Sequence, residues 1–172
     1  MPFTPFHMGP GLMIKAVLQG SFSLMVFGWA QVVMDIQPLF AMVTGEGQLH
    51  GFSHTYLGAT LLAIFSGLTG KYLAEFGLLW LEISQADNPI KITWWISILS
   101  AFIGTYSHVV LDSVMHADMQ PFYPWFQDNA LLGVISVSGL QQACLYSGLI
   151  GAAAYFSLIY LRKKNLHISS WR

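Results

Sequence analysis

Residues 104–125 read GTYSHVVLDSVMHADMQPFYPW, and this stretch places three ionisable side chains at a regular interval in an apolar run. His108, Asp112 and His116 are four residues apart, so on an α-helix, with 3.6 residues per turn, they lie on one face. An ionisable residue inside a membrane is costly and marks a functional site by default. The spacing therefore predicts a stripe of metal-binding groups on a membrane helix. The alternative is a helix end whose polar groups simply meet water.

The composition of the chain is that of a membrane protein. Of the 172 residues, 55% are hydrophobic and 9% are charged, whereas about 25% are charged in an ordinary soluble domain. This length fits one membrane-embedded domain over residues 1–172. The formal net charge of -1 gives no indication of nucleic acid as a partner, and the single cysteine excludes an internal disulfide.

Three long apolar runs predict helices that cross the membrane in alternating directions, at about residues 51–68, 92–117 and 130–161. Gly67 and Gly70 indicate a break after the first run, and Lys71 to Ile83 would then lie along the membrane surface. The alternation brings most of the histidines to one membrane face. It brings most basic residues to the other face, namely Lys71, Lys91, Arg162, Lys163, Lys164 and Arg172. By the positive-inside rule the basic face and the C-terminus are cytoplasmic, and the histidines face outward from an expected bacterial inner membrane.

Residues 11–35 allow two arrangements. One continuous helix of 25 residues would be about 37 Å long and would place His7 and Asp35 on opposite membrane faces. A reversal at Gly20-Ser21, with Ser23 as the cap of the second helix, would bring both residues to one face. Each arm would then be about 15–20 Å long, too short to cross the ~30 Å hydrocarbon core. We expect this second arrangement, so the predicted fold is an all-α integral membrane protein with three to four transmembrane helices, three if the N-terminal hairpin is re-entrant.

This topology gathers seven candidate metal ligands, with Asp118 just beyond them as an eighth: His7, Asp35, His50, His54, His108, Asp112 and His116. Imidazole and carboxylate groups without thiolate suit zinc, or manganese or iron in a harder site. A closed structural site needs about four ligands, so the larger set predicts two ions that share a bridging carboxylate. Such paired ions suit hydrolysis. Among the seven, Asp35, Asp112 and His116 are expected to serve the reaction most directly.

Several candidates also have an ordinary structural interpretation. His7 lies in a Pro-rich loop, Asp35 could cap the helix that follows it, and Asp118 could be solvated. His54 could orient a neighbouring ligand instead of binding metal. Gln31, one helical turn before Asp35, could hydrogen-bond to that carboxylate.

The chain resembles a known family at four short, ordered motifs: Thr-Pro-Phe-His-x-Gly at residues 4–9, Asp35, HGFSHT at residues 50–55 and SHVVLD at residues 107–112. These look like the predicted membrane-bound metal-dependent hydrolases, the YdjM-like proteins, over roughly residues 4–125. That family is thought to be distantly similar to zinc-dependent phospholipase C and the fungal single-strand nucleases. Those are all-helical enzymes with three zinc ions.

The resemblance implies a division of the ligands. Asp35, His50, His108 and Asp112 would hold the main ion, and the Asp112 carboxylate would bridge to a second. His7, with His54 or His116, would complete that second site. Position 1 is Met where the soluble enzymes have a zinc-binding Trp, and their later His-x3-Glu/Asp set is missing. We therefore expect two ions, most simply zinc, instead of three.

The expected function is hydrolysis of a phosphoester in a lipid or lipid-linked substrate at the outer membrane boundary. Four aromatic residues, Phe122, Tyr123, Trp125 and Trp29, would accommodate acyl chains or anchor the membrane surface. Two other classes stay open: a metal or proton transporter, since His/Asp chains in membranes also line ion pathways, and a metal-stabilised scaffold. The sequence leaves the oligomeric state open.

Overall fold

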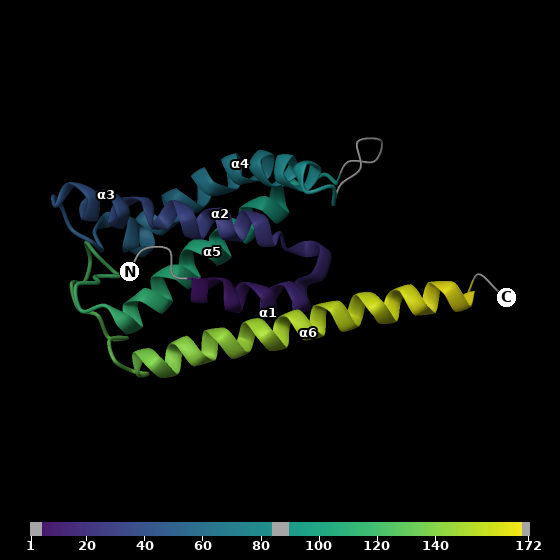
Figure 1. The fold of residues 1–172 in the computed structure, drawn as a ribbon. Helices are drawn as coiled ribbons and strands as arrows, with labels where there is room; N and C mark the ends of the chain where they lie inside the picture. The colour runs from purple at the N-terminus through teal and green to yellow at the C-terminus, as the bar shows by residue number, and fades with distance from the viewer. Residues whose placement is uncertain (1–4, 84–89, 170–172) are drawn as a thin grey trace.

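The computed structural model describes residues 5–83 and 90–169, with side chains for residues 6–83 and 90–164, and contains only helices within those ranges. Three short 3-10 helices are present: η1 (Pro5–His7), η2 (Gln19–Ser21) and η3 (Phe52–His54). The α-helices are α1 (Met8–Leu18), α2 (Leu24–Met34), α3 (Ile36–Thr44), α4 (Tyr56–Trp80), α5 (Trp94–Met115) and α6 (Val137–Ser169). Figure 1 shows α2, α4 and α5 side by side, with α1 and α6 alongside them.

The chain reverses between α1 and α2, which confirms the expected turn near Gly20 (Figure 1). Ser23 is the N-cap of α2, and its hydroxyl accepts a hydrogen bond from the backbone N–H of Val26 at 3.4 Å. On the other side of the turn, the Lys15 ammonium donates to the carbonyls of Gln19 and Phe22, each at 2.7 Å. The reversal returns the end of α2 to the end of the molecule where α1 begins.

A proline explains why the helix pauses at Asp35. Pro38 has no N–H to bond the carbonyl of Met34, and its ring crowds that carbonyl. The helix therefore ends at Met34 and resumes at Ile36, with Asp35 at the junction. Asp35 makes no side-chain cap to α3, so the capping interpretation is wrong.

Within the described residues, four segments are long and apolar enough to cross a membrane: Leu24–Thr44, Tyr56–Trp80, Trp94–Met115 and Val137–Lys164. The three-span arrangement ended the first of these segments at Asp35, but α3 extends it to 21 residues. The count by length and composition is therefore four. The 11-residue α1, about 16 Å long, is not among them. That the hairpin is re-entrant stays a prediction.

The expected break in α4 is wrong, because the helix runs without interruption from Tyr56 to Trp80. Gly67 and Gly70 instead permit close packing: an added Cβ would lie 2.5 Å from Ile98 Cδ1 and 2.9 Å from Trp29 Cδ1, respectively. Lys71 belongs to this same helix and pairs with Glu75, whose carboxylate also accepts the backbone N–H of Ile92 at 2.8 Å. The second half of α4 is thus tied to the start of α5 and is not a separate surface helix.

The other two predicted spans differ from the structure mainly at their ends. α5 ends at Met115, and His116 is its C-cap in extended conformation. α6 begins at Val137, seven residues later than expected. The segment between them is a loop that holds the aromatic residues Phe122, Tyr123 and Trp125. Its buried Met119 packs with Met34, Ala59 and Val109, in a small core at the ends of α2, α4 and α5.

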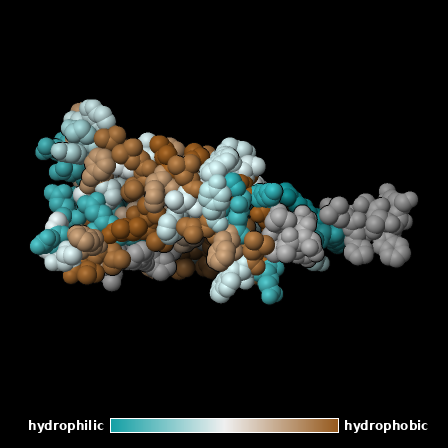
Figure 2. Space-filling view, turned by 90° about the horizontal axis from the view of Figure 1, so that it is seen from above, coloured by the Kyte–Doolittle hydropathy of each residue, from teal (hydrophilic) through white to brown (hydrophobic). Residues whose placement is uncertain are grey.

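The surface in Figure 2 has hydrophobic residues over its middle and hydrophilic residues towards both ends, one of which holds α3 and the loop after α5. With the four apolar segments, this distribution is that of an integral membrane protein. The candidate ligands meet at the hydrophilic end that holds α3.

Candidate metal centre

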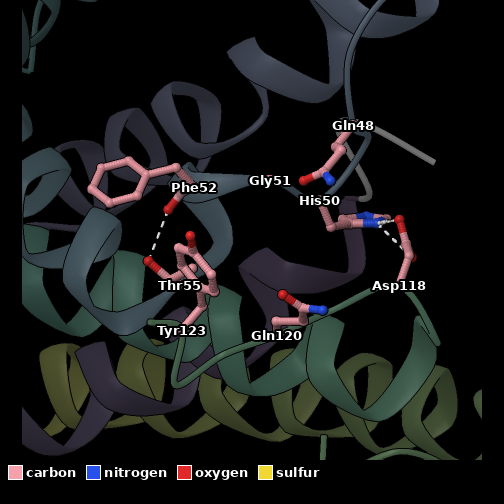
Figure 3. A pocket seen from close by; sticks show the side chains of 8 residues that line it. All are labelled: Gln48, His50, Gly51, Phe52, Thr55, Asp118, Gln120 and Tyr123. Carbon is pink, nitrogen blue, oxygen red and sulfur yellow. Dashed lines mark hydrogen bonds and ion pairs between the residues drawn. The ribbon is translucent and has the colours of Figure 1, made fainter. Parts of the chain in front are cut away.

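All seven candidate ligands come together at one end of the helices. η1 ends at His7, Asp35 lies between α2 and α3, and η3 ends at His54. α5 carries His108 and Asp112 one turn apart on its buried face. His50 and His116 lie at the more open side, with their rings stacked at a centroid distance of 4.1 Å, and His50 pairs there with Asp118 (Figure 3). The alternative in which these polar groups simply meet water therefore does not hold for five of them, which are buried: His7, Asp35, His54, His108 and Asp112.

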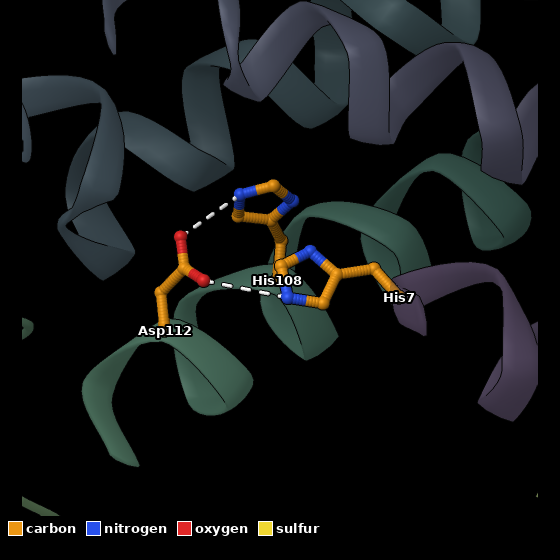
Figure 4. A group of neighbouring side chains, drawn as sticks. All are labelled: His7, His108 and Asp112. Atoms are coloured by element: carbon orange, nitrogen blue, oxygen red, sulfur yellow. Dashed lines mark ion pairs between the residues drawn. The ribbon is translucent and has the colours of Figure 1, made fainter. Parts of the chain in front are cut away.

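Asp112 is the centre of this group. Its Oδ2 lies 3.1 Å from Nε2 of His108 and 3.4 Å from Nε2 of His54. Its Oδ1 lies 3.4 Å from Nε2 of His7 and 4.0 Å from Nε2 of His116. Figure 4 shows the two oxygens directed at His108 and His7. Each carboxylate oxygen thus has its own pair of histidines.

The separations fit a metal coordination sphere. Ligand atoms about 2.1 Å from a tetrahedral ion are about 3.4 Å from one another. Besides the Asp112 contacts, Oδ1 of Asp35 lies 3.5 Å from Nε2 of His108. The Nε2 atoms of His7, His54 and His108 are buried and lack a hydrogen-bond partner of suitable geometry among the described residues. Because an unsatisfied buried polar atom is costly, a bound cation would supply the missing partner.

The ring orientation of His108 follows from Gln31. The Gln31 side-chain N–H donates to the carbonyl of Gly104 at 3.1 Å, so its Oε1 is the atom that faces His108 Nδ1 at 2.6 Å. His108 Nδ1 must then carry the proton, which leaves the lone pair of Nε2 directed at the carboxylates. Gln31, which the sequence suggested as a partner of Asp35, orients His108.

Two further histidines are held in the same way. Nδ1 of His54 lies 2.8 Å from the hydroxyl of Ser53, and Nδ1 of His50 lies 2.9 Å from Oδ2 of Asp118. Metal-binding histidines usually donate the second ring N–H to such a group, which fixes the ring and leaves the other nitrogen for the ion. Ser53 therefore supports a candidate ligand. The cap of α4 is Thr55, whose hydroxyl accepts from Gly58 N at 2.9 Å.

Four overlapping groups among the described residues could hold an ion: His7–His108–Asp112, Asp35–His54–His108, His50–His54–Asp112 and His50–His116–Asp118. The ligand atoms within each group lie within 4.8 Å of one another. The family resemblance grouped His50 with Asp35 and His108. In the structure His54 occupies that place, and His50 lies nearer to His116 and Asp118.

Burial favours the neutral, metal-binding form of three histidines outside the spans, His7, His54 and His116. It lowers the pKa of His7 to about 4, with His108 acting in the same direction and Asp112 against it. Burial also lowers the pKa of His54 and of His116. Neutral imidazole is the form that binds metal, so these rings need lose no proton near neutral pH.

The fold and this centre define a class: a helical integral membrane protein whose buried histidines and aspartates could hold a metal ion. The family model for the YdjM inner membrane protein matches residues 13–166, and the chain belongs to that family. The match includes every candidate ligand except His7 and confirms the resemblance at the level of the family. No curated protein and no solved structure matches the chain.

Proposed function

We propose that the protein is a metal-dependent hydrolase that cleaves a phosphoester of a lipid or lipid-linked substrate. The observation that carries the proposal is the double use of Asp112. Its Oδ2 is closest to His54 and His108, and its Oδ1 is closest to His7 and His116. A carboxylate in this position suits two neighbouring ions. The nitrogen and oxygen donors suit zinc best, with manganese or iron as alternatives.

A pair of bound ions supplies an activated water and a clamp on phosphoryl oxygens. The residues of the chain have separate tasks around it. Asp35 and Asp112 neutralise positive charge in a buried setting, and the His108 ring is held rigidly by Gln31. The His116 side chain is 26% exposed and lies 4.0 Å from Asp112, farther than His7, His54 or His108. It is the ligand candidate best placed to face substrate and exchange a proton with it.

The position of the centre favours a lipid substrate. Asp112 lies close to the end of the candidate span Trp94–Met115, with His108 one turn before it, and Asp35 lies at the junction between α2 and α3. The neighbouring loop carries exposed aromatic residues, with Trp125 at 69% and Phe126 at 67% exposure. Aromatic side chains of this kind favour the membrane–water boundary. A phosphoester there is within reach of the centre while its chains remain in the bilayer.

The test is a matched pair of acid-to-amide substitutions in purified protein. Asp112→Asn should lose bound metal and hydrolysis of phospholipids or isoprenyl phosphates. Asp128→Asn changes an exposed aspartate in the loop after α5 and should leave both intact. Metal bound at full occupancy with no cleavage of any phosphoester would contradict the hydrolase proposal. Metal uptake into proteoliposomes would then support transport, and a single closed ion would support a scaffold.

A further inference from the structure

A cavity of about 270 Å³ opens beside the metal centre. It lies between the segment that leads into α4 and the loop after α5 (Figure 3). His50 and Asp118 line its wall, and both also belong to one of the candidate metal groups. A group bound in the cavity would therefore lie next to the centre. Binding sites for drug-sized ligands are about 300–1,000 Å³, so this one suits a single headgroup and leaves lipid chains outside.

The lining offers uncharged hydrogen-bonding groups. Figure 3 shows the side-chain amides of Gln48 and Gln120 extending into the same space, with the Tyr123 hydroxyl nearby. Neither amide has a hydrogen bond to another side chain or backbone group in the part of the chain that the structure describes. Each amide can donate and accept, so both are available to a ligand with hydroxyl or amine groups. The ring of Tyr123 provides an apolar wall.

The charged side chain in the cavity lining is negative. Among the described residues of the lining, Asp118 is the acidic one, with its side chain 53% exposed, and none is a lysine or arginine. Lys15, the basic residue of the N-terminal hairpin, is bonded to backbone carbonyls at the turn between α1 and α2. An anionic group in the cavity would approach Asp118 without a cationic side chain to offset the repulsion. Metal ions in the centre could offset one phosphate, which would be the scissile one.

We propose that this cavity binds the substrate headgroup and selects headgroups that carry hydrogen-bond donors but no negative charge beyond the scissile phosphate. The inference rests on the proposed function for the identity of the ligand as a substrate. The binding preference itself can be measured on metal-free protein, where no reaction takes place.

The experiment compares two lipids that differ by one charged group, phosphatidylinositol and its monophosphorylated form with the same acyl chains. Metal-free protein in detergent is titrated with each lipid, and the bound fraction is measured by native mass spectrometry. Wild-type protein should bind the unphosphorylated lipid at least about tenfold more tightly. Gln120→Lys should remove most of that preference by adding a cation to the lining. Gln127→Lys adds the same charge to an exposed position of the same loop outside the cavity and should preserve the preference.

Equal or tighter binding of the phosphorylated lipid by wild-type protein would overturn the inference, as would equal effects of Gln120→Lys and Gln127→Lys. The failure of the hydrolase proposal has a different signature. In that case the headgroup preference and its response to Gln120→Lys persist, yet metal-loaded protein cleaves neither lipid nor any other phosphoester. Thermal unfolding of each variant shows whether a loss of binding reflects a loss of fold.

Discussion

Gln31 Oε1 lies 2.6 Å from Nδ1 of His108, although the two residues are 77 positions apart in the chain. The same glutamine donates to the carbonyl of Gly104, one turn earlier on α5. These two bonds fix the position of α2 against α5 and the face that His108 presents to the carboxylates. One side chain therefore contributes both to the packing of α2 against α5 and to the orientation of His108 in the candidate centre.

Replacement of Gln31 should weaken metal binding without removing a ligand. Gln31→Leu leaves His108 Nδ1 without its acceptor, so the ring loses its fixed tautomer and orientation. Loss of such a supporting group typically costs about 10- to 100-fold in metal affinity. Competition with a zinc chelator measures the change. Gln142→Leu, on the exposed face of α6, is the control, and equal affinities in the two variants would contradict the orienting role.

The two outer histidines of the helix stripe should differ in their importance. His108 belongs to two candidate metal groups and is fully buried, whereas His116 Nε2 lies 4.0 Å from Asp112 and its side chain is partly exposed. His108→Ala should therefore remove bound metal, while His116→Ala should retain most of it and lose hydrolysis. Both proteins should remain in the membrane, because insertion depends on the apolar spans. Elemental analysis and membrane fractionation give the two readouts, and unchanged metal in His108→Ala would contradict the assignment.

Acidification should destabilise the metal-free protein through His7. The pKa of this residue is about 4 in the folded protein, against about 6.5 in an unfolded chain. The unfolded state therefore binds more protons between these values. The contribution of His7 to the free energy of unfolding is fully present above pH 6.5. It is lost as the pH falls towards 4 and amounts to at most about 3 kcal/mol. The midpoint temperature of unfolding should change less with pH in His7→Gln than in the wild-type protein. An identical pH dependence in the two proteins would show that His7 does not cause it.

The positive-inside rule predicts that the C-terminus is cytoplasmic and that the loop after α5 faces outward. A reporter that is active only in the cytoplasm should be active when fused after Arg172. A cysteine at position 127, in place of the exposed Gln127, should react with an impermeant reagent added from outside. Cys144 is buried and is replaced by alanine to remove background. The opposite pattern would direct the centre to substrates of the cytoplasmic leaflet.

Packing between α1 and α6 should affect the centre from a distance. A Cβ at Gly151 would lie 2.4 Å from the backbone nitrogen of Met13, so Gly151→Val must displace α1. His7 directly precedes α1 and should move with it, which lowers metal affinity. Gly20→Ala is the control, because nothing lies within 4 Å of its Cβ. The zinc affinity of both variants is measured by competition with a chelator. An unchanged affinity in Gly151→Val would contradict a role of His7 in metal binding.

The part of the centre that follows helical periodicity could be predicted from the sequence. His108 and Asp112 are four residues apart, and the structure places both on the buried face of α5. The reversal near Gly20 also followed from local chemistry, since a serine suited to capping comes three residues later. In both cases the signal lies within a few residues, where helix geometry fixes the outcome.

The arrangement of His50 and His54 could not be predicted in this way. They precede α4 in a turn that contains the 3-10 helix η3, where a spacing of four does not define a face. Which of the two lies against Asp35 and His108 depends on tertiary contacts, including that of Ser53 N–H with Gln37 Oε1 at 3.0 Å. Gly67 and Gly70 were ambiguous for a similar reason, because glycine serves close helix packing as well as helix breaks.

The seating of α1 against α6 has a consequence for the order in which the protein is completed during synthesis. Asp35, His54, His108 and Asp112 belong to segments made before α6, so their side of the centre can form while the chain is still growing. α1 is made first but lies along α6 (Figure 1), where Gly9 abuts the carbonyl of Cys144 and Gly151 abuts Met13. The packing partner of α1 is therefore made last, and His7 precedes α1 directly. If the centre holds two ions as proposed, the groups around Oδ2 of Asp112 are all made before α6, whereas the site at Oδ1 gains His7 only after the final helix is in place.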